Sequence, residues 1–209
     1  MHSKKFIPRA VLTSVALLTP YLMSAAEATA PGIERFHQVN EKVYRGAQPS
    51  AQGFQHLAKI GVKTVIDLRE AGSRSTAEQK TVTAAGMKYV SIPMRGFSTP
   101  VAADVAKAVA ILNDPNAGPV FVHCKQGVDR TGTVLAVYRM THDKWDNPRA
   151  LAEAKQIGMH WIEKQMQSYI RNYRVESVVA DAKVNPAPVT AAAQPAVQPV
   201  AQAAPVAAQ

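Results

Sequence analysis

The segment from Pro119 to Gly132 constrains the fold of this chain more than any other. Its residues read PVFVHCKQGVDRTG, and the apolar run 120–122 has no polar alternation, which predicts a short strand buried on both faces. Helix-forming residues follow from Thr133 to Met140, so the chain must pass from strand to helix within a few residues. The N–H groups of such a loop and of the helix start converge on one small anion.

A thiol and a guanidinium lie on this loop. Cys124 is the single cysteine of the 209 residues, and Arg130 follows after five intervening residues. The partial positive charge of a helix start favours the thiolate, which is a nucleophile. Arg130 offers a fork of donors that matches two phosphate oxygens, Thr131 can hydrogen-bond the cysteine sulfur, and Gly127 permits backbone geometry that a Cβ would block. This set suits covalent removal of a phosphoryl group.

The pattern His-Cys-x-x-Gly-x-x-Arg-Thr-Gly, starting at His123, resembles the phosphate-binding loop of cysteine-dependent tyrosine and dual-specificity phosphatases. Segments 43–49 and 63–69 look like the opening strands of bacterial, plant and fungal atypical members, and the resemblance covers about residues 35–175. It implies that Cys124 forms a phosphocysteine, which water then hydrolyses without a metal or cofactor. It also implies that the phosphate oxygens are held by the loop residues Lys125, Gln126, Gly127, Val128, Asp129 and Arg130.

Three other interpretations compete with catalysis. Cys124 could be a buried structural cysteine, since free cysteine behaves as a small hydrophobe. A rhodanese-like sulfurtransferase also carries a cysteine loop, although that loop is usually one residue shorter. The third alternative is a weakly active phosphate-binding module, a pseudophosphatase. A structural cysteine leaves Arg130, Gly127 and Thr131 as coincidences, and the intact Cys124, Arg130 and Thr131 speak against the phosphate-binding module.

The proton donor is missing from its usual place. In most of the family it is an Asp on a loop before the cysteine, but residues 92–100 contain no Asp or Glu, and Asp104 lies past the expected helix start. Asp129 is one candidate acid, as in relatives with a Cys-x-x-Gly-x-Asp-Arg loop, and a structural partner of nearby groups is the alternative. Residues 94–100 also resemble the corresponding loop of plant and fungal atypical phosphatases that act on inositol pyrophosphates. The leaving group of such a substrate is already acidic and needs less protonation.

Several residues are expected to support the site. His123 would tune the thiol through backbone contacts, and Asp67 and Arg69 would hold the loop by an ion pair, with Arg45 in the same network. Arg95 and Phe97 would line one rim, and Lys125 would add charge at the mouth. Packing, without a direct part in the site, is expected for Met159, His160 and Trp161.

Hydrophobic periodicity and turn signals predict an α/β fold. It would have a central, mostly parallel sheet of four to five strands flanked by helices on both faces, with Cys124 at the carboxyl end of a central strand. The expected strands are 42–46, 63–68, 87–92 and 119–123, and the expected helices are 50–60, 75–85, 100–113, 131–142, 148–157 and 160–176. Three helix starts are indicated by Ser75 with Glu78, by Thr99–Pro100 and by Asn147–Pro148.

The N-terminus has the pattern of a secretory signal peptide. A basic start with Lys4, Lys5 and Arg9 precedes an apolar run, residues 10–22, that is short for a membrane span, and small residues follow. We therefore expect residues 1–28 to be a cleaved signal peptide and the protein to be periplasmic or secreted, with an uncleaved anchor as the alternative. A lone cysteine cannot form an internal disulfide in that oxidising compartment.

The remaining chain is predicted to hold a phosphatase domain, residues 29–178, and a disordered tail, residues 179–209. The tail is rich in Ala, Pro, Val and Gln, and no aromatic residue follows Tyr173, so it cannot bury enough surface to order itself. Its alternative role is a tether to the cell envelope.

The formal charge of +9 indicates acidic partners. We expect a phosphorylated protein, an inositol phosphate or a phosphoinositide as substrate, with peripheral contact to the envelope. Nucleic acid is not expected, because no basic run carries interleaved aromatics. Zinc is not expected either, because no Cys/His pair has ligand spacing. We expect a monomer.

Overall fold

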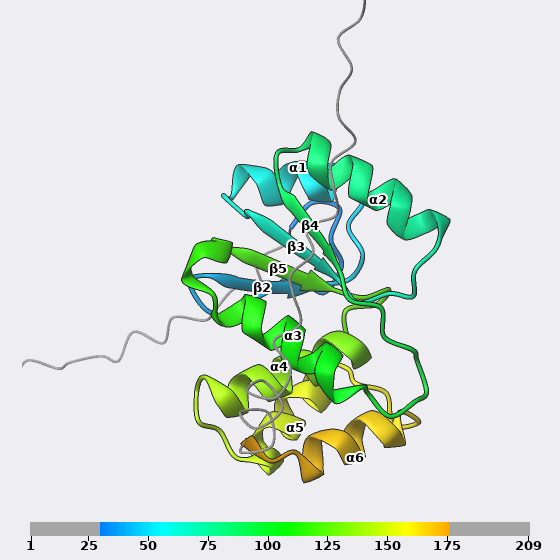
Figure 1. The fold of residues 1–209 in the computed structure, drawn as a ribbon, viewed down its shortest axis with the longest axis vertical. Helices are drawn as coiled ribbons and strands as arrows, with labels where there is room; N and C mark the ends of the chain where they lie inside the picture. The colour runs from blue at the N-terminus through cyan, green and yellow to red at the C-terminus, as the bar shows by residue number, and fades with distance from the viewer. Residues whose placement is uncertain (1–29, 176–209) are drawn as a thin grey trace, which may run out of the picture.

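The computed structural model of the protein describes residues 30–175. The predicted signal peptide, the predicted tail and both predicted domain boundaries lie outside these residues. One sheet separates two layers of helices: α1 and α2 cover one face, and α3 to α6 cover the other (Figure 1). The predicted α/β architecture is therefore confirmed.

The sheet has five strands in the order β1-β2-β5-β3-β4. Pairing is parallel throughout except between β1 and β2, which is antiparallel. The strands are β1 (His37–Gln38), β2 (Val43–Gly46), β3 (Thr64–Asp67), β4 (Lys88–Ser91) and β5 (Val120–His123). The sequence predicted four of them and missed β1, whose two residues are too few to show a period-two pattern.

Within residues 30–175, six α-helices alternate with or follow the strands, as the sequence predicted. They are α1 (Ala51–Lys59), α2 (Ser73–Ala84), α3 (Ala102–Asn113), α4 (Asp129–Thr141), α5 (Asn147–Gln156) and α6 (Lys164–Asn172), with a short 3-10 helix at Pro115–Ala117.

Two predicted helix starts shift by one or two residues. Helix α3 begins after Val101, so Thr99 and Pro100 precede its cap. Helix α5 is capped by Asp146, whose side chain accepts the N–H of Arg149 at 2.8 Å.

The predicted capping pair of α2 is wrong. The cap residue is Gly72, and the Ser75 hydroxyl accepts the Gly72 N–H and donates to the Gly72 carbonyl, both at 2.9 Å. Glu78 does not fold back onto this helix start. It is buried and points instead toward the carboxyl ends of the strands, where it has other partners.

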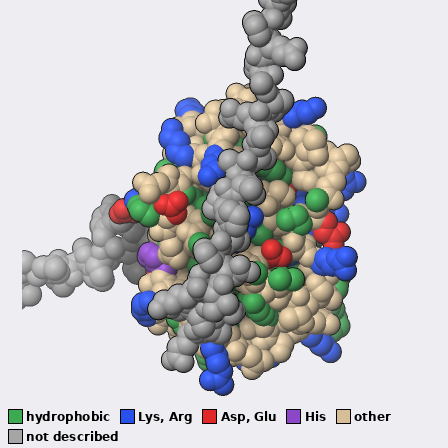
Figure 2. All heavy atoms as spheres, in the orientation of Figure 1, with side chains coloured by type: hydrophobic (Ala, Val, Ile, Leu, Met, Phe, Trp, Pro, Cys, Tyr) green, Lys and Arg blue, Asp and Glu red, His purple; other side chains and the backbone are tan. Residues whose placement is uncertain are grey.

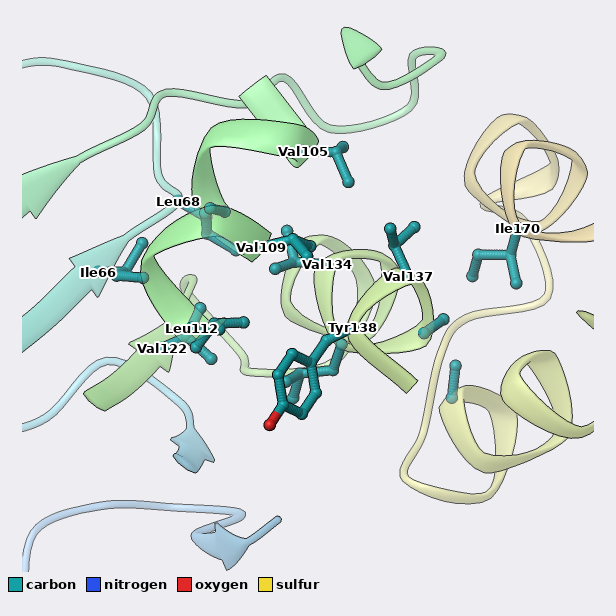
Figure 3. Packing of buried hydrophobic residues seen from close by; sticks show 14 of the residues in the cluster. Ile66, Leu68, Val105, Val109, Leu112, Val122, Val134, Val137, Tyr138 and Ile170 are labelled. Atoms are coloured by element: carbon teal, nitrogen blue, oxygen red, sulfur yellow. The ribbon is translucent and has the colours of Figure 1, made fainter. Parts of the chain in front are cut away.

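The core on the α3–α6 side packs sheet residues against these four helices (Figure 3). Ile66 and Val122 of the sheet, with Leu68 just after β3, meet apolar side chains of α3 and α4. Ile170 of α6 closes the far end. A second cluster fills the α1–α2 side around Phe54, Leu57 and Phe121. Strand β5 is thus buried on both faces, as its unbroken apolar run predicted.

Charge is dispersed on the face of the molecule that Figure 2 shows. On the visible face, Lys and Arg side chains are scattered around the molecule and do not gather in one patch (Figure 2). Among residues 30–175, no helix combines the length and the apolar character needed to cross a bilayer.

Candidate active site

Cys124 lies directly after the central strand β5. The last residue of that strand, His123, is in register with Gly46 of β2 and with Asp67 of β3, so three strand ends meet at the thiol. Cys124 is a free cysteine and only 2% exposed. The thiol therefore sits at the bottom of the site, at the edge of the sheet where open α/β folds bind ligands.

The loop after Cys124 turns its carbonyl groups outward. The carbonyls of Lys125, Gln126 and Gly127 accept hydrogen bonds from residues of the N-terminal part of the chain. These donors are Gln48 N at 3.2 Å, Arg35 Nη1 at 3.4 Å and Arg45 Nη2 at 2.7 Å. Because C=O and N–H point in opposite directions in a trans peptide, the N–H groups that follow these carbonyls face the inside of the loop. This is the geometry of an anion cradle.

Gly127 is required at the tightest point of this loop. Its φ of +73° lies in the left-handed region, and a Cβ there would collide with the backbone of Gly46. The loop therefore packs backbone against backbone on the end of β2, which no side chain at this position would permit. The predicted role of Gly127 agrees with this geometry.

Arg130 lies in the first turn of α4, with its side chain half-buried. Its Nη1 donates to the carbonyl of Met94 at 3.3 Å, a long bond that still leaves donors of the fork available. Thr131 is fully buried, and its hydroxyl has no hydrogen-bond partner within residues 30–175. The predicted bond from Thr131 to the sulfur of Cys124 is therefore not formed here, although the hydroxyl remains free to make one.

A buried charged network supports the nucleophile loop. Arg69 pairs with Asp67 at 2.6 Å, as predicted, and also with Glu78 at 2.7 Å. Glu78 in turn lies 2.8 Å from His123 Nε2, and His123 Nδ1 lies 3.2 Å from the carbonyl of Cys124. Both ring nitrogens of His123 therefore lie close to oxygen atoms of buried neighbours.

Burial alone would raise the pKa of Asp67, but the hydrogen bonds from Arg69 and the charge of His123 outweigh it and lower the pKa. The oxygen and nitrogen atoms of Asp67, Glu78 and His123 lie within 4.8 Å of one another, as metal ligands would. Arg69 already bonds both carboxylates, however. The guanidinium thus supplies the positive charge that the cluster needs.

Arg45 supports the loop by a contact of its own. It is 1% exposed, and besides its bond to Gly127 it lies near the thiol. Burial lowers the pKa of Arg45 to about 10, while negative charge on Glu153 and on Cys124 opposes the shift. The sequence placed Arg45 in the network of Asp67 and Arg69; its hydrogen bond goes to the loop backbone instead.

Asp129 is held by the segment between α5 and α6. Its two carboxylate oxygens lie 2.8 Å from the backbone N and from Nδ1 of His160. The prediction that His160 only packs is therefore wrong, and Trp161, also expected to pack, is 79% exposed. Met159 is buried as expected. These contacts support a structural role for Asp129; its role as an acid stays a prediction.

The mouth of the site is lined by exposed side chains. Lys125 and Gln126 are exposed on one side, which agrees with the expected extra charge at the mouth. Arg95 is also exposed, and Phe97 is 66% exposed, so both predicted rim residues are open to solvent. Buried Val128 closes the loop at the start of α4.

Sequence reasoning missed Glu78 and Glu163, the second of which is 4% exposed beside Phe97. Both residues lie near the start of a predicted helix, and the sequence around them indicates nothing beyond that helix. The residues that they contact are distant in sequence. No local signal could have found these contacts.

Comparison with known proteins agrees with the loop geometry. The family model described as "DSP-PTPase phosphatase fused to NAD+ Kinase" matches residues 26–172, which is more than half of the chain. The chain belongs to the DSP-PTPase phosphatase family. Within this family it is similar to the dual specificity protein phosphatase TpbA of Pseudomonas aeruginosa strain UCBPP-PA14, with 32% identity over 137 residues. That match covers 64% of this chain and 58% of TpbA, so the chain spans less than two thirds of this relative.

Other DSP-PTPase relatives extend the comparison. Inositol diphosphatase DSP5 of Arabidopsis thaliana is 25% identical over 145 residues, covering 67% of this chain and 70% of the relative. The crystal structure of P. aeruginosa TpbA superposes with a TM-score of 0.62 and 26% identity, covering 75% of this chain and 95% of that one. The core catalytic domain of the S. cerevisiae PP-IP phosphatase SIW14 has the same fold, with a TM-score of 0.62, 21% identity and coverage of 76% and 96%.

Proposed function

We propose that this chain is a phosphatase that hydrolyses phosphate monoesters through a phosphocysteine on Cys124. The observation that carries the proposal is the loop itself. Its carbonyls are tied outward by Arg35, Arg45 and Gln48, which leaves the N–H groups, the thiol and the start of α4 around one anion site. Membership in the DSP-PTPase family supports the same reaction.

In this mechanism the Cys124 thiolate attacks phosphorus, and the bond from phosphorus to the leaving oxygen breaks as the S–P bond forms. Arg130 and the loop N–H groups hold the three equatorial oxygens. The leaving oxygen takes a proton from Asp129, which is paired with His160 and directly precedes Arg130 in sequence. A water then attacks phosphorus, returns a proton to the pair, releases inorganic phosphate and restores the thiolate.

We propose phosphorylated protein side chains as the substrate class, with phosphotyrosine foremost. One relative supports this choice in two ways: TpbA is a dual specificity protein phosphatase, and its Cys-to-Ser variant has been solved in complex with phosphotyrosine. The solved variant shares 25% identity with this chain and superposes with a TM-score of 0.60.

Hydrolysis of an aryl phosphate by purified protein tests the reaction. We expect turnover by the wild type, a burst consistent with a covalent intermediate, and a loss of at least about 10³-fold in Cys124→Ser. The Ser variant should still bind inorganic phosphate. Phosphate binding without turnover by the wild type would refute the proposal and favour a phosphate-binding module.

The proton donor needs a separate test. We compare Asp129→Asn with the wild type on aryl phosphates of rising leaving-group pKa, because an acid matters most for poor leaving groups. A steeper dependence in Asp129→Asn supports the Asp129–His160 pair. An unchanged dependence means that Asp129 only holds the loop between α5 and α6.

Soluble inositol pyrophosphate is a second candidate substrate. The segment from Ile92 to Pro100 carries no carboxylate, and a pyrophosphate leaving group needs little protonation. The similarity to inositol diphosphatase DSP5 points the same way. Profiling Cys124→Ser as a substrate trap against phosphotyrosyl peptide, phosphoinositide and inositol pyrophosphate separates these classes.

We also propose that the protein is exported to the periplasm or secreted. The basic start, apolar run and small residues before position 29 support this location. Fractionation of cells that express the full chain, followed by N-terminal sequencing, tests it. An intact N-terminus in the cytoplasmic fraction would contradict the proposal.

A further inference from the structure

One buried carboxylate joins the two loops that border Arg130. The first loop, residues 93–100, leads from β4 to α3, and the second, residues 158–163, leads from α5 to α6 (Figure 1). Glu163 ends the second loop, and its carboxylate oxygens accept the N–H of Phe97 on the first at 3.1 and 3.3 Å. The distance in sequence between these partners is 66 residues.

Phe97 adopts a backbone conformation that its side chain disfavours. Its φ is +53°, in the left-handed region, and its aromatic ring is 66% exposed. A bulky residue persists in this region only where its surroundings fix the backbone. The ring gains little burial in return, so the hydrogen bond to Glu163 is the contact that holds Phe97 in place.

The same short loop reaches Arg130. The carbonyl of Met94 accepts Arg130 Nη1 at 3.3 Å, three residues before Phe97. The loop is thus tied at one end to the guanidinium that is to bind phosphate, and at the other end to Glu163. A shift of the loop would change both the rim at Phe97 and the surroundings of Arg130.

The carboxyl group of Glu163 has both negatively and positively charged neighbours. Burial raises its pKa, and the negative charge of Asp129 adds to the rise, while the Phe97 N–H, Arg130 and His160 oppose it. Neutral and charged forms both offer an oxygen to Phe97, since either a carbonyl or a carboxylate oxygen accepts. The contact with Phe97 therefore requires a side chain of this length that ends in an acceptor oxygen, and it does not require a negative charge.

We propose that Glu163 is a positioning residue that fixes the loop of Met94 to Phe97 against the phosphate site. Its oxygen holds the N–H of Phe97, and through that loop it sets the rim beside Arg130. The proposal deepens the function proposed above and rests on it where turnover is measured. The contact itself is measured independently of any activity.

Three substitutions of Glu163 distinguish the effect of side-chain length from the effect of charge. Glu163→Gln keeps the length and an acceptor oxygen, Glu163→Asp keeps the charge but is one methylene shorter, and Glu163→Ala removes both. Gln165→Ala, exposed on α6, is the matched control. Binding of inorganic phosphate shows for each variant that the fold and the anion cradle are intact.

Amide hydrogen exchange at Phe97 is the first measurement. We expect slow exchange in the wild type, Glu163→Gln and Gln165→Ala, and exchange at least about tenfold faster in Glu163→Asp and Glu163→Ala. The second measurement is kcat/KM on a phosphotyrosyl peptide. It should fall about tenfold in the Asp and Ala variants and by less than about threefold in Glu163→Gln, in keeping with the loss of one buried hydrogen bond.

Unchanged exchange in Glu163→Asp and Glu163→Ala would overturn the proposal. So would a Gln variant that protects Phe97 but loses as much kcat/KM as the Ala variant, because a proton donor and not a positioning oxygen would then be missing. If the wild type shows no turnover, the proposed function fails, and hydrogen exchange alone still decides the role of Glu163. If Glu163→Ala does not fold, Glu163→Asp against Glu163→Gln decides it.

Discussion

Glu78 Oε1 lies 2.8 Å from His123 Nε2, so a carboxylate of helix α2 reaches the residue beside the nucleophile. Both side chains are nearly inaccessible to solvent, and Arg69 closes the network on the other side of Glu78. The carboxylate thus balances two buried groups that can carry positive charge. This contact makes helix α2, which contributes nothing to the phosphate loop in sequence, part of the support of the site.

Replacing Glu78 by Ala should destabilise the fold by about 3 kcal/mol, because Arg69 and His123 would lose a shared buried partner. Urea unfolding measures this loss. Glu70→Ala, an exposed carboxylate between β3 and α2, should stay within about 0.5 kcal/mol of the wild type. Equal effects of the two substitutions would show that the Glu78 network does not stabilise the protein.

Arg130→Lys should lower kcat/KM by about 10²–10³-fold, because an ammonium cannot place two parallel donors on a phosphate. The thermal stability should change little, since the bond of Arg130 to Met94 is long. Steady-state kinetics on an aryl phosphate gives the answer, with the exposed Arg74→Lys as the control. Near wild-type turnover by Arg130→Lys would remove Arg130 from the proposed mechanism.

Gly127→Ala should abolish binding of inorganic phosphate and destabilise the fold by about 2 kcal/mol or more. A Cβ at this position would meet the backbone of Gly46, and φ is +73°. Calorimetric titration with phosphate and urea unfolding test the two effects. Gly72→Ala is the control, because no atom lies within 4 Å of a Cβ built there and its φ of 167° is extended.

The pKa of Glu163 predicts a pH dependence of stability. Burial and Asp129 raise this pKa above its ordinary value of 4.5, so the folded state holds the proton more tightly than the unfolded state. The stabilisation is complete below about pH 4.5 and is lost as pH rises through the folded pKa. Glu163→Gln has no titrating group at this position, so it does not lose this stabilisation. Its free energy of unfolding relative to that of the wild type should therefore increase with pH over that window.

Urea unfolding at several pH values between 4 and 8 measures the difference between Glu163→Gln and the wild type. A difference that stays constant, or that shrinks with rising pH, would contradict the raised pKa. Gln165→Ala should show no pH-dependent difference, since it changes no titratable group.

The fold could be predicted because most of its strands and helices have a hydrophobic pattern that is visible within the element itself. The apolar run of β5 and the periodic patterns of the helices can each be found within a window of a few residues. The phosphate loop was found for the same reason, since Cys124, Gly127 and Arg130 lie within seven consecutive positions. Strand β1 was not predicted, because its two residues are too few to show an alternating pattern.

The parts of the site that sequence could not predict are contacts between distant segments. Glu78 fits a local capping pattern and was assigned to it. Ser75 and Thr76 bond the helix start instead, and Glu78 lies against the buried Arg69 and His123. His160 lies 31 residues from Asp129, and no periodicity connects them. Trp161 was expected to pack because it is large and aromatic, yet it projects into solvent.

The outward bonds of the phosphate loop also bear on the order of folding. Gly127 is held by Arg45, 82 residues earlier, and Gln126 by Arg35, 91 residues earlier. Contacts of such large sequence separation form late, because they close long stretches of chain. The loop after Cys124 can therefore take its final shape only once the early segment with Arg35 and Arg45 has paired with β5. The anion cradle around Cys124 is therefore a product of the completed sheet.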